Sequence, residues 1–354
     1  MDCKVSKLQK NFPKDVDAII VSSEINQYYL SGFRYTDGYL VIFQDKAFIL
    51  CDFRYYEAAK NLSPDGFEII RPEGSMLDEI RSLLSDHSAK QVGFEDLRLN
   101  CSTLERMKKA FEASELVPIG RAIESLREIK DPDEAENMIR AQRIAEKALD
   151  HIIGFISPDK TEIDVALELE FYMRKNGAEA ASFEIIAVSG TSSSLPHGVP
   201  RNVRLEKGFF TLDFGAVYNG YCSDMTRTIC IGKADAEMKK IYDTVLNAQL
   251  AAIAQIKPGM TGKEADGIAR KIIEDAGYGK CFGHSLGHSV GIEIHESPNL
   301  SPKEERNIVP GNVVTVEPGI YIEGNYGVRI EDMGIITESG YSNFTKAPKE
   351  LIEL

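Results

Sequence analysis

Short apolar runs alternate with amphipathic segments along the first part of the chain. Runs rich in Val, Ile, Leu and Phe predict strands at 17–21, 38–43, 46–51, 67–72 and 91–94. The segments at 54–62, 75–87 and 103–115 have apolar residues spaced by three and four, which predicts helices. This alternation is typical of a small α/β domain whose sheet is covered by helices.

A second unit begins at a strong helix start. Asp131 followed by Pro132 combines an N-cap residue with proline at the first helical position. The charged stretch before it predicts a linker near 119–128, and we therefore divide the chain into domains 1–122 and 123–354.

The second unit contains an internal repeat. Identical residues recur at a spacing of 100 positions, with a proline turn, a threonine at a helix start and a glycine stop in each copy. The pairs are Ile156 and Ile256, Pro158 and Pro258, Thr161 and Thr261, and Gly177 and Gly277. We predict two α/β halves, about 129–231 and 233–336, related by duplication and packed face to face.

Composition narrows the class of protein. The chain has 354 residues with 43% hydrophobic and 27% charged side chains, as in an ordinary soluble enzyme. The formal charge of −14 argues against a nucleic-acid partner, which requires a basic face. There is neither a long apolar run nor a signal-like N-terminus, so we expect no membrane partner and a cytoplasmic location.

Each predicted half carries a pair of acidic residues in strand-like sequence. Asp213 and Asp224 flank a turn signal around Asn219, so a hairpin would bring them close together. Glu317 and Glu331 occupy similar positions in the second half. A carboxylate inside apolar sequence is costly unless it is paired or metal-bound, although a turn or cap role for the aspartates stays open.

Histidines gather in the same region. His197, His284, His288 and His295 lie beside glycine or proline and outside helical patterns. Two Asp, two Glu and one His suit two hard or borderline divalent ions bridged by carboxylates, with Mn²⁺ expected and Co²⁺ or Zn²⁺ as alternatives.

On these motifs the chain resembles the proline-specific pita-bread metallopeptidases, the family of aminopeptidase P and prolidase. The segment His284-Ser-Leu-Gly-His288-Ser-Val-Gly-Ile-Glu-Ile-His295-Glu296 is similar to the family's histidine signature, and LDFG, VEPG and VRIED are similar to its metal motifs. The resemblance covers nearly the whole chain. It implies an α/β fold (α+β) with an N-terminal creatinase-like domain and a pseudo-symmetric pita-bread catalytic domain.

The resemblance also implies a ligand set for two metal ions. Asp213 would ligate one ion, Asp224 and Glu331 would bridge both, and His288 and Glu317 would complete the second. Hydrolysis would then proceed through a metal-bridging hydroxide.

Further roles follow from the same resemblance. Glu317 would shuttle the proton, His197 and His295 would contact the scissile carbonyl and the oxyanion, and His284 and Arg329 would orient the ligands. The substrate would be a peptide with proline at the second position, and a homodimer is expected.

Two alternatives to an aminopeptidase P remain. Prolidases cleave only dipeptides and often hold the free carboxylate with an arginine after the HE-x-P turn, where this chain has Asn299. Asparagine supplies no bidentate cation, so the sequence favours aminopeptidase P and leaves prolidase as the alternative. A catalytically inactive pita-bread binding protein is a remote third possibility, because all five ligand positions are filled.

Overall fold

The computed structural model describes residues 3–354, which form two compact units that divide between Arg127 and Glu128. Our predicted boundary after residue 122 stays a prediction, since a division by contacts need not coincide with a folding domain. None of the helices in the described residues has the length and apolar character needed to cross a membrane.

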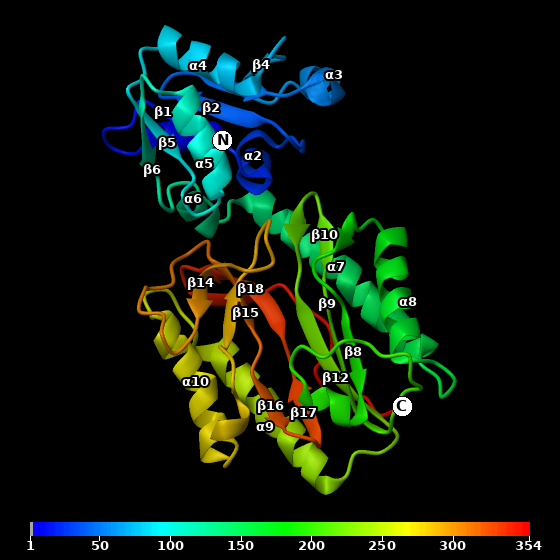
Figure 1. The fold of residues 1–354 in the computed structure, drawn as a ribbon. Coiled ribbons are helices and arrows are strands. Elements are labelled where there is room, and N and C mark those ends of the chain that lie inside the picture. The colour runs from blue at the N-terminus through cyan, green and yellow to red at the C-terminus, as the bar shows by residue number, and fades with distance from the viewer. Residues whose placement is uncertain (1–2) are drawn as a thin grey trace. The chain divides into compact units, whose positions relative to one another are not determined.

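The N-terminal unit is built on one mixed six-stranded sheet, shown in the blue and cyan part of Figure 1. Its order is β4-β3-β2-β1-β5-β6, in which β2 runs antiparallel to both of its neighbours and every other adjacent pair is parallel. The strands are β1 (Ala18–Val21), β2 (Tyr39–Phe43), β3 (Ala47–Leu50), β4 (Glu68–Ile70), β5 (Gln91–Phe94) and β6 (Glu115–Pro118). The first five confirm the predicted strands.

The helices of this unit agree less closely with the predicted ranges. They are α1 (Lys4–Lys10), α2 (Glu24–Ser31), α3 (Phe53–Leu62), α4 (Met76–Asp86), α5 (Cys101–Ala110) and α6 (Glu124–Glu128). Helix α5 ends five residues before the predicted position 115, because Phe111 leaves helical geometry and is buried in the core. Helices α4 and α5 pack on one face of the sheet through a shared apolar core.

The second unit repeats one pattern twice, as predicted. Its first half contains α7 (Pro132–Phe155), α8 (Glu162–Lys175), β7 (Ala180–Ala181), β8 (Ile186–Ser189), β9 (Gly208–Phe214), β10 (Ala216–Tyr218), β11 (Tyr221–Cys222) and β12 (Met225–Ile231). Its second half contains α9 (Ala236–Gln255), α10 (Gly262–Asp275), β13 (Gly287–Ser289), β14 (Glu296–Leu300), β15 (Val313–Val316), β16 (Gly319–Ile322), β17 (Tyr326–Arg329), β18 (Asp332–Thr337) and β19 (Gly340–Asn343).

Helix ends show how closely the halves correspond. Thr161 and Thr261 each accept a hydrogen bond from the backbone three residues later, and each forms a full capping box. The residues that cap the C-terminal ends of the preceding helices, Ile156 and Ile256, have nearly identical backbone angles. Asp131 also caps α7 with Pro132 in its first turn, as predicted.

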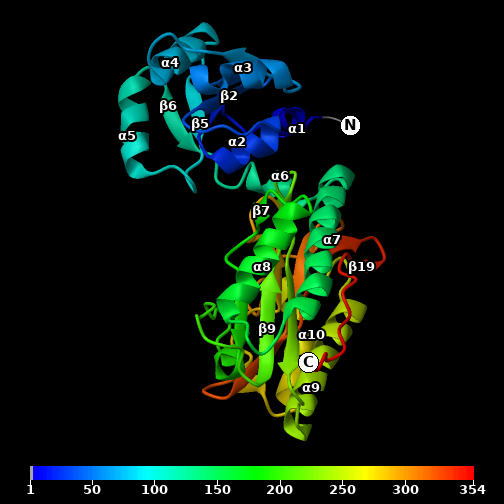
Figure 2. The ribbon, with the colours of Figure 1, turned by 90° about the vertical axis from the view of Figure 1, so that its right-hand side faces the viewer.

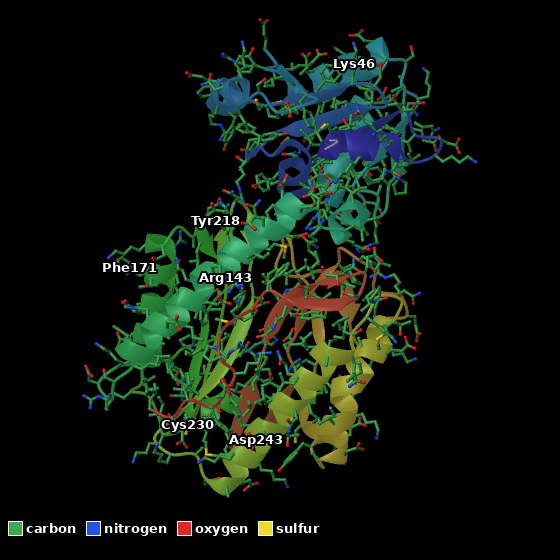
Figure 3. All side chains as sticks on the ribbon, turned by 180° about the vertical axis from the view of Figure 1, so that it is seen from behind. Lys46, Arg143, Phe171, Tyr218, Cys230 and Asp243 are labelled. Carbon is green, nitrogen blue, oxygen red and sulfur yellow. The ribbon has the colours of Figure 1, made fainter. Side chains whose placement is uncertain are left out.

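Each half has its own apolar core between a helix pair and its strands. One core joins α7 and α8 to β8, β9 and β12, and the other joins α9 and α10 to the second group of strands. Figure 2 shows α7, α8 and α9 beside the strands, and Figure 3 shows from behind how α7 with Arg143 and α9 with Asp243 cover them. The mixed α/β class is thereby confirmed.

Candidate metal centre

The first acidic pair lies on a twisted hairpin. In the β9–β12 ladder Asp213 is opposite Thr226, and Asp224 directly precedes β12. Residues 224 and 226 lie two apart, so their side chains share a face, and Asp224 is a diagonal neighbour of Asp213 on that face. Asn219 and Gly220 form the predicted turn with positive φ values of 45° and 75°.

The second acidic pair ends the ladder of β15 and β18. Val316 is opposite Asp332 in the last pair of this antiparallel ladder. The next residues beyond that pair, Glu317 on one chain segment and Glu331 on the other, are therefore side by side. The backbone N–H of Glu331 donates to the carbonyl of Thr226 at 3.1 Å. This bond joins the two halves where their four carboxyl groups converge.

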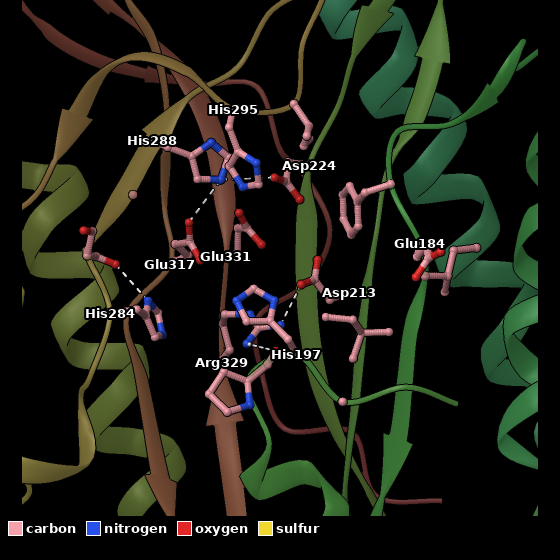
Figure 4. A pocket seen from close by; sticks show the side chains of 18 of the residues that line it. Glu184, His197, Asp213, Asp224, His284, His288, His295, Glu317, Arg329 and Glu331 are labelled. Atoms are coloured by element: carbon pink, nitrogen blue, oxygen red, sulfur yellow. Dashed lines mark hydrogen bonds and ion pairs between the residues drawn. The ribbon is translucent and has the colours of Figure 1, made fainter. Parts of the chain in front are cut away.

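His288 completes a compact group of ligand atoms. Its Nε2 lies 3.5 Å from Asp224 Oδ2 and 3.4 Å from Glu317 Oε1. Its Nδ1 lies 3.1 Å from the carbonyl of Ser289, which only accepts, so Nδ1 carries the proton and Nε2 keeps a lone pair. One ligand atom each from Asp224, His288 and Glu331 lie within 4.8 Å of one another (Figure 4).

Asp213 is tied to the group through Arg329. The guanidinium donates to Asp213 Oδ2 at 2.6 Å, to Thr226 Oγ1 at 3.0 Å and to the Tyr321 hydroxyl at 2.6 Å. Thr226 in turn donates to Glu331 Oε2 at 2.6 Å. Arg329 therefore fixes one carboxylate directly and a second through a hydroxyl.

The Tyr321 hydroxyl links His284 to the same arginine. Its Nδ1 donates to the carbonyl of Ser285 at 2.8 Å, and its Nε2 accepts from the Tyr321 hydroxyl at 3.0 Å. Burial, with a smaller effect of the Arg329 charge, lowers the pKa of His284 to about 4. The imidazole is therefore neutral and acts as an acceptor that orients Tyr321.

Burial strongly perturbs the ionisation of the ligand atoms. It raises the pKa of Glu317 to about 8 and holds the pKa values of Asp224 and Glu331 well above their usual range. Repulsion among neighbouring carboxylates adds to this shift. Burial also lowers the pKa of His288 to about 4. Without cations these carboxyl groups retain protons, and bound cations would reverse that.

Two oxygens at the centre have no protein donor. Asp213 Oδ1 and Glu331 Oε1 are buried and have no hydrogen-bond partner among residues 3–354. Leaving such atoms unpaired costs about 1–3 kcal/mol each. Oxygen donors with one imidazole are the ligands of hard or borderline divalent ions, so the residues fit divalent metal ions.

All nine predicted site residues line one cavity of about 500 Å³. The five predicted ligands lie beside His197, His284, His295 and Arg329, and Figure 4 shows them converging from both halves. The His288 and His295 rings are 4.4 Å apart between centroids. The other lining residues are mainly apolar, as in a pocket for a small ligand: Phe183, Ile185, Ile186, Pro196, Val199, Pro200 and Ile294.

Sequence reasoning missed the hydroxyl groups that hold the ligands. Thr226 bridges Arg329 and Glu331, Thr315 donates to Glu317 Oε1 at 3.1 Å, and Tyr321 links Arg329 to His284. Threonine and tyrosine are common in strands, so nothing in their local sequence marks them. Only the alternation that places residues 224 and 226 on one face points to Thr226.

Comparisons with known proteins agree with this geometry. Residues 136–338 match the family described as Metallopeptidase family M24, and residues 5–129 match the Creatinase/Prolidase N-terminal domain. An Xaa-Pro dipeptidase of Pyrococcus furiosus is 40% identical over 99% of both chains.

Solved structures give the same result. The Xaa-Pro dipeptidase from Bacillus anthracis has a TM-score of 0.96 at 44% identity and 99% coverage of both chains. The X-Pro aminopeptidase from Thermotoga maritima has a TM-score of 0.93 at 34% identity, covering 98% of this chain and 99% of that one. The resemblance and fold class indicated by the sequence are confirmed.

Proposed function

Because the chain belongs to metallopeptidase family M24, we propose that it is a divalent-metal-dependent Xaa-Pro dipeptidase, which hydrolyses the bond before the proline of a dipeptide. The observation that carries this proposal is the convergence of Asp224, His288 and Glu331 within 4.8 Å at a cavity of about 500 Å³. A cavity of this size suits a small peptide, and the dipeptide is favoured by the relatives described as Xaa-Pro dipeptidases.

Five residues would hold two metal ions. Asp213 would help to hold one ion, His288 and Glu317 the other, and Asp224 and Glu331 would serve both. The unpaired oxygens of Asp213 and Glu331 support this assignment, as does the neutral Nε2 of His288. When bound, divalent ions supply Lewis-acid activation of water and of the scissile carbonyl.

The chain's own groups bind and orient the substrate. Glu317, whose Oε1 accepts from Thr315, holds and passes on the proton at its carboxylate. His295 and His197, on opposite loops of the cavity, donate to the substrate carbonyl and stabilise charge that develops on it. Arg329 keeps Asp213 in place.

Substrate length is the point at which the comparisons change the sequence-based interpretation. The absence of arginine at Asn299 favoured aminopeptidase P, whereas relatives of 40% and 44% identity are described as Xaa-Pro dipeptidases. We therefore favour the alternative, prolidase. Aminopeptidase P remains the second candidate, because Asn299 lines the cavity and the similar Thermotoga maritima structure is of an X-Pro aminopeptidase.

A substrate panel tests the proposal. Purified protein is incubated with Mn²⁺, Co²⁺ or Zn²⁺ and either Xaa-Pro dipeptides or matched Xaa-Pro-Yaa tripeptides, and the released amino acid is measured. Cleavage confined to dipeptides supports the dipeptidase, and efficient cleavage of tripeptides supports aminopeptidase P. If neither is cleaved with any metal, the proposed function is wrong. Mn²⁺ as the preferred ion, the homodimer and the cytoplasmic location stay predictions.

A further inference from the structure

A buried ion pair lies behind the loop that carries His295. Lys130 Nζ is 3.0 Å from Glu296 Oε2 and 3.2 Å from Ser289 Oγ. The Lys130 side chain is 1% exposed and that of Glu296 is 6% exposed. Burying both charges is expensive, and such a pair stabilises a fold no better than apolar side chains of equal volume. The ion pair is therefore better explained by the groups that it holds in place than by a gain in stability.

The lysine projects from a fixed piece of backbone. Its own N–H donates to the carbonyl of Gly311 at 2.9 Å. The next residue, Asp131, is locked by the reciprocal hydrogen bonds of its capping box with Glu134. The backbone at Lys130 is thus anchored, and the buried ammonium group is held by its contacts with Glu296 and Ser289.

The glutamate organises the loop between β13 and β14. Its Oε1 accepts from the N–H of Glu293 at 3.1 Å. A Cβ on Gly291 would lie 2.4 Å from both Glu296 oxygens, so the carboxylate lies directly against that backbone. The backbone at Gly291 and Glu293 therefore packs against the carboxylate that Lys130 holds.

Chain connectivity transmits this constraint to His295, the residue directly before Glu296 and β14. His288 pairs with Asn299 but Ser289 pairs with Glu296, so β14 carries two extra residues at this point. The backbone that holds the Glu296 carboxylate against Lys130 therefore also places His295, which lines the cavity with its ring 4.4 Å from the His288 ring.

We propose that Lys130 is a positioning residue for His295: through Glu296 and Ser289 it sets the register of the β13–β14 loop and so the placement of the His295 imidazole against the substrate. This inference rests on the proposed function, because it takes His295 to contact the substrate. An error of about 1 Å in a group that contacts the reacting atoms costs about 100-fold in rate.

The test separates positioning from stabilisation. Lys130→Met removes the cation that faces the buried Glu296 carboxylate, so we expect a lower Tm and a lower kcat/KM. The double variant Lys130→Met/Glu296→Met removes both charges, so we expect its Tm to return toward that of the unchanged protein. If Lys130 positions His295, kcat/KM on an Xaa-Pro dipeptide stays at least tenfold low, mainly in kcat, at unchanged metal content. Recovery of kcat/KM together with Tm would overturn the proposal.

Two further variants complete the design. Lys263→Met removes a 2.8 Å pair with Glu305 in which the lysine is 55% exposed, and it should leave Tm and kcat/KM unchanged. Glu296→Gln, of nearly equal shape, serves if the double variant does not fold. It should lower kcat/KM at least several-fold, and an unchanged value would refute the proposal.

A structural measurement keeps this inference distinct from the proposed function. Crystal structures of the unchanged protein and the double variant compare the His295 ring with the His288 ring. Displacement of His295 is expected, and an undisturbed ring would overturn the proposal whether or not any substrate has been found. Failure of the unchanged protein to cleave any Xaa-Pro peptide would count against the proposed function alone.

Discussion

The substitution Glu317→Gln should stabilise the metal-free protein at alkaline pH and abolish its stabilisation by metal. The Glu317 side chain is 15% exposed, and burial raises its pKa from 4.5 to about 8. A carboxyl group with a raised pKa contributes stability that is fully present below its unfolded pKa and is lost as the pH rises through the folded pKa. The window is therefore pH 4.5 to about 8, over which stability falls as the pH rises.

The size of the effect follows from the shift. Ionising a carboxyl group that is buried beside other carboxylates costs several kcal/mol, because each unit by which burial raises the pKa is worth about 1.36 kcal/mol. Glutamine stays neutral and keeps the oxygen that accepts from Thr315. Chelator-treated Glu317→Gln should thus match the unchanged protein at pH 5 and exceed its free energy of unfolding by several kcal/mol at pH 8.5.

Urea denaturation of chelator-treated protein at both pH values measures this difference, with and without added Mn²⁺. The control Glu305→Gln alters a carboxylate that is 71% exposed and should change little. A Glu317→Gln protein that is no more stable at pH 8.5 would refute the electrostatic reasoning. A Mn²⁺-induced stabilisation equal to that of the unchanged protein would refute the role of Glu317 as a ligand.

Three further outcomes are expected. Asp224→Ala removes a proposed ligand of both ions, so turnover should fall by more than about 100-fold. Elemental analysis should show a lower metal content while the circular dichroism spectrum stays native, and near-normal turnover would exclude two bridged ions. Gly215→Ala would place a Cβ 1.8 Å from the Ser223 carbonyl oxygen, so urea denaturation should show a loss of about 3 kcal/mol, and an unchanged midpoint would contradict the close approach of the two strands. Asn299→Arg, opposite His288 in the ladder, would add a cation at the cavity and should raise dipeptide over tripeptide kcat/KM about tenfold; an unchanged ratio would show that position 299 does not reach the substrate carboxylate.

Local sequence signals are sufficient to predict the two repeated α/β halves of the second unit. The two threonine caps and the glycine stops 100 residues apart are short-range features, because a cap contacts only the backbone three residues away. The strands at 17–21 and 91–94 were likewise visible as short apolar runs. The predicted helix at 103–115 was too long because burial of Phe111, a tertiary effect, ends it early.

The candidate site was visible as chemistry but not as geometry. Buried ionisable groups are costly unless they are paired or metal-bound, so carboxylates and histidines inside apolar sequence are candidate site residues: Asp213, Asp224, His288, Glu317 and Glu331. Their number and type indicated divalent metals. Asn299 favours aminopeptidase P only when the missing arginine is considered apart from the rest of the pocket.

What the sequence by itself determined is therefore the mixed α/β class, the repeat and the acidic and imidazole groups. Only the tertiary structure decided which hydroxyl and ammonium groups hold the acidic residues in place, since those hydrogen bonds and ion pairs join residues far apart in the chain. Thr226 and Glu331 are 105 residues apart, and Lys130 and Glu296 are 166 apart. A hydroxyl or an ammonium acquires such a role only where folding removes water and brings distant partners within reach, and no local pattern records those partners.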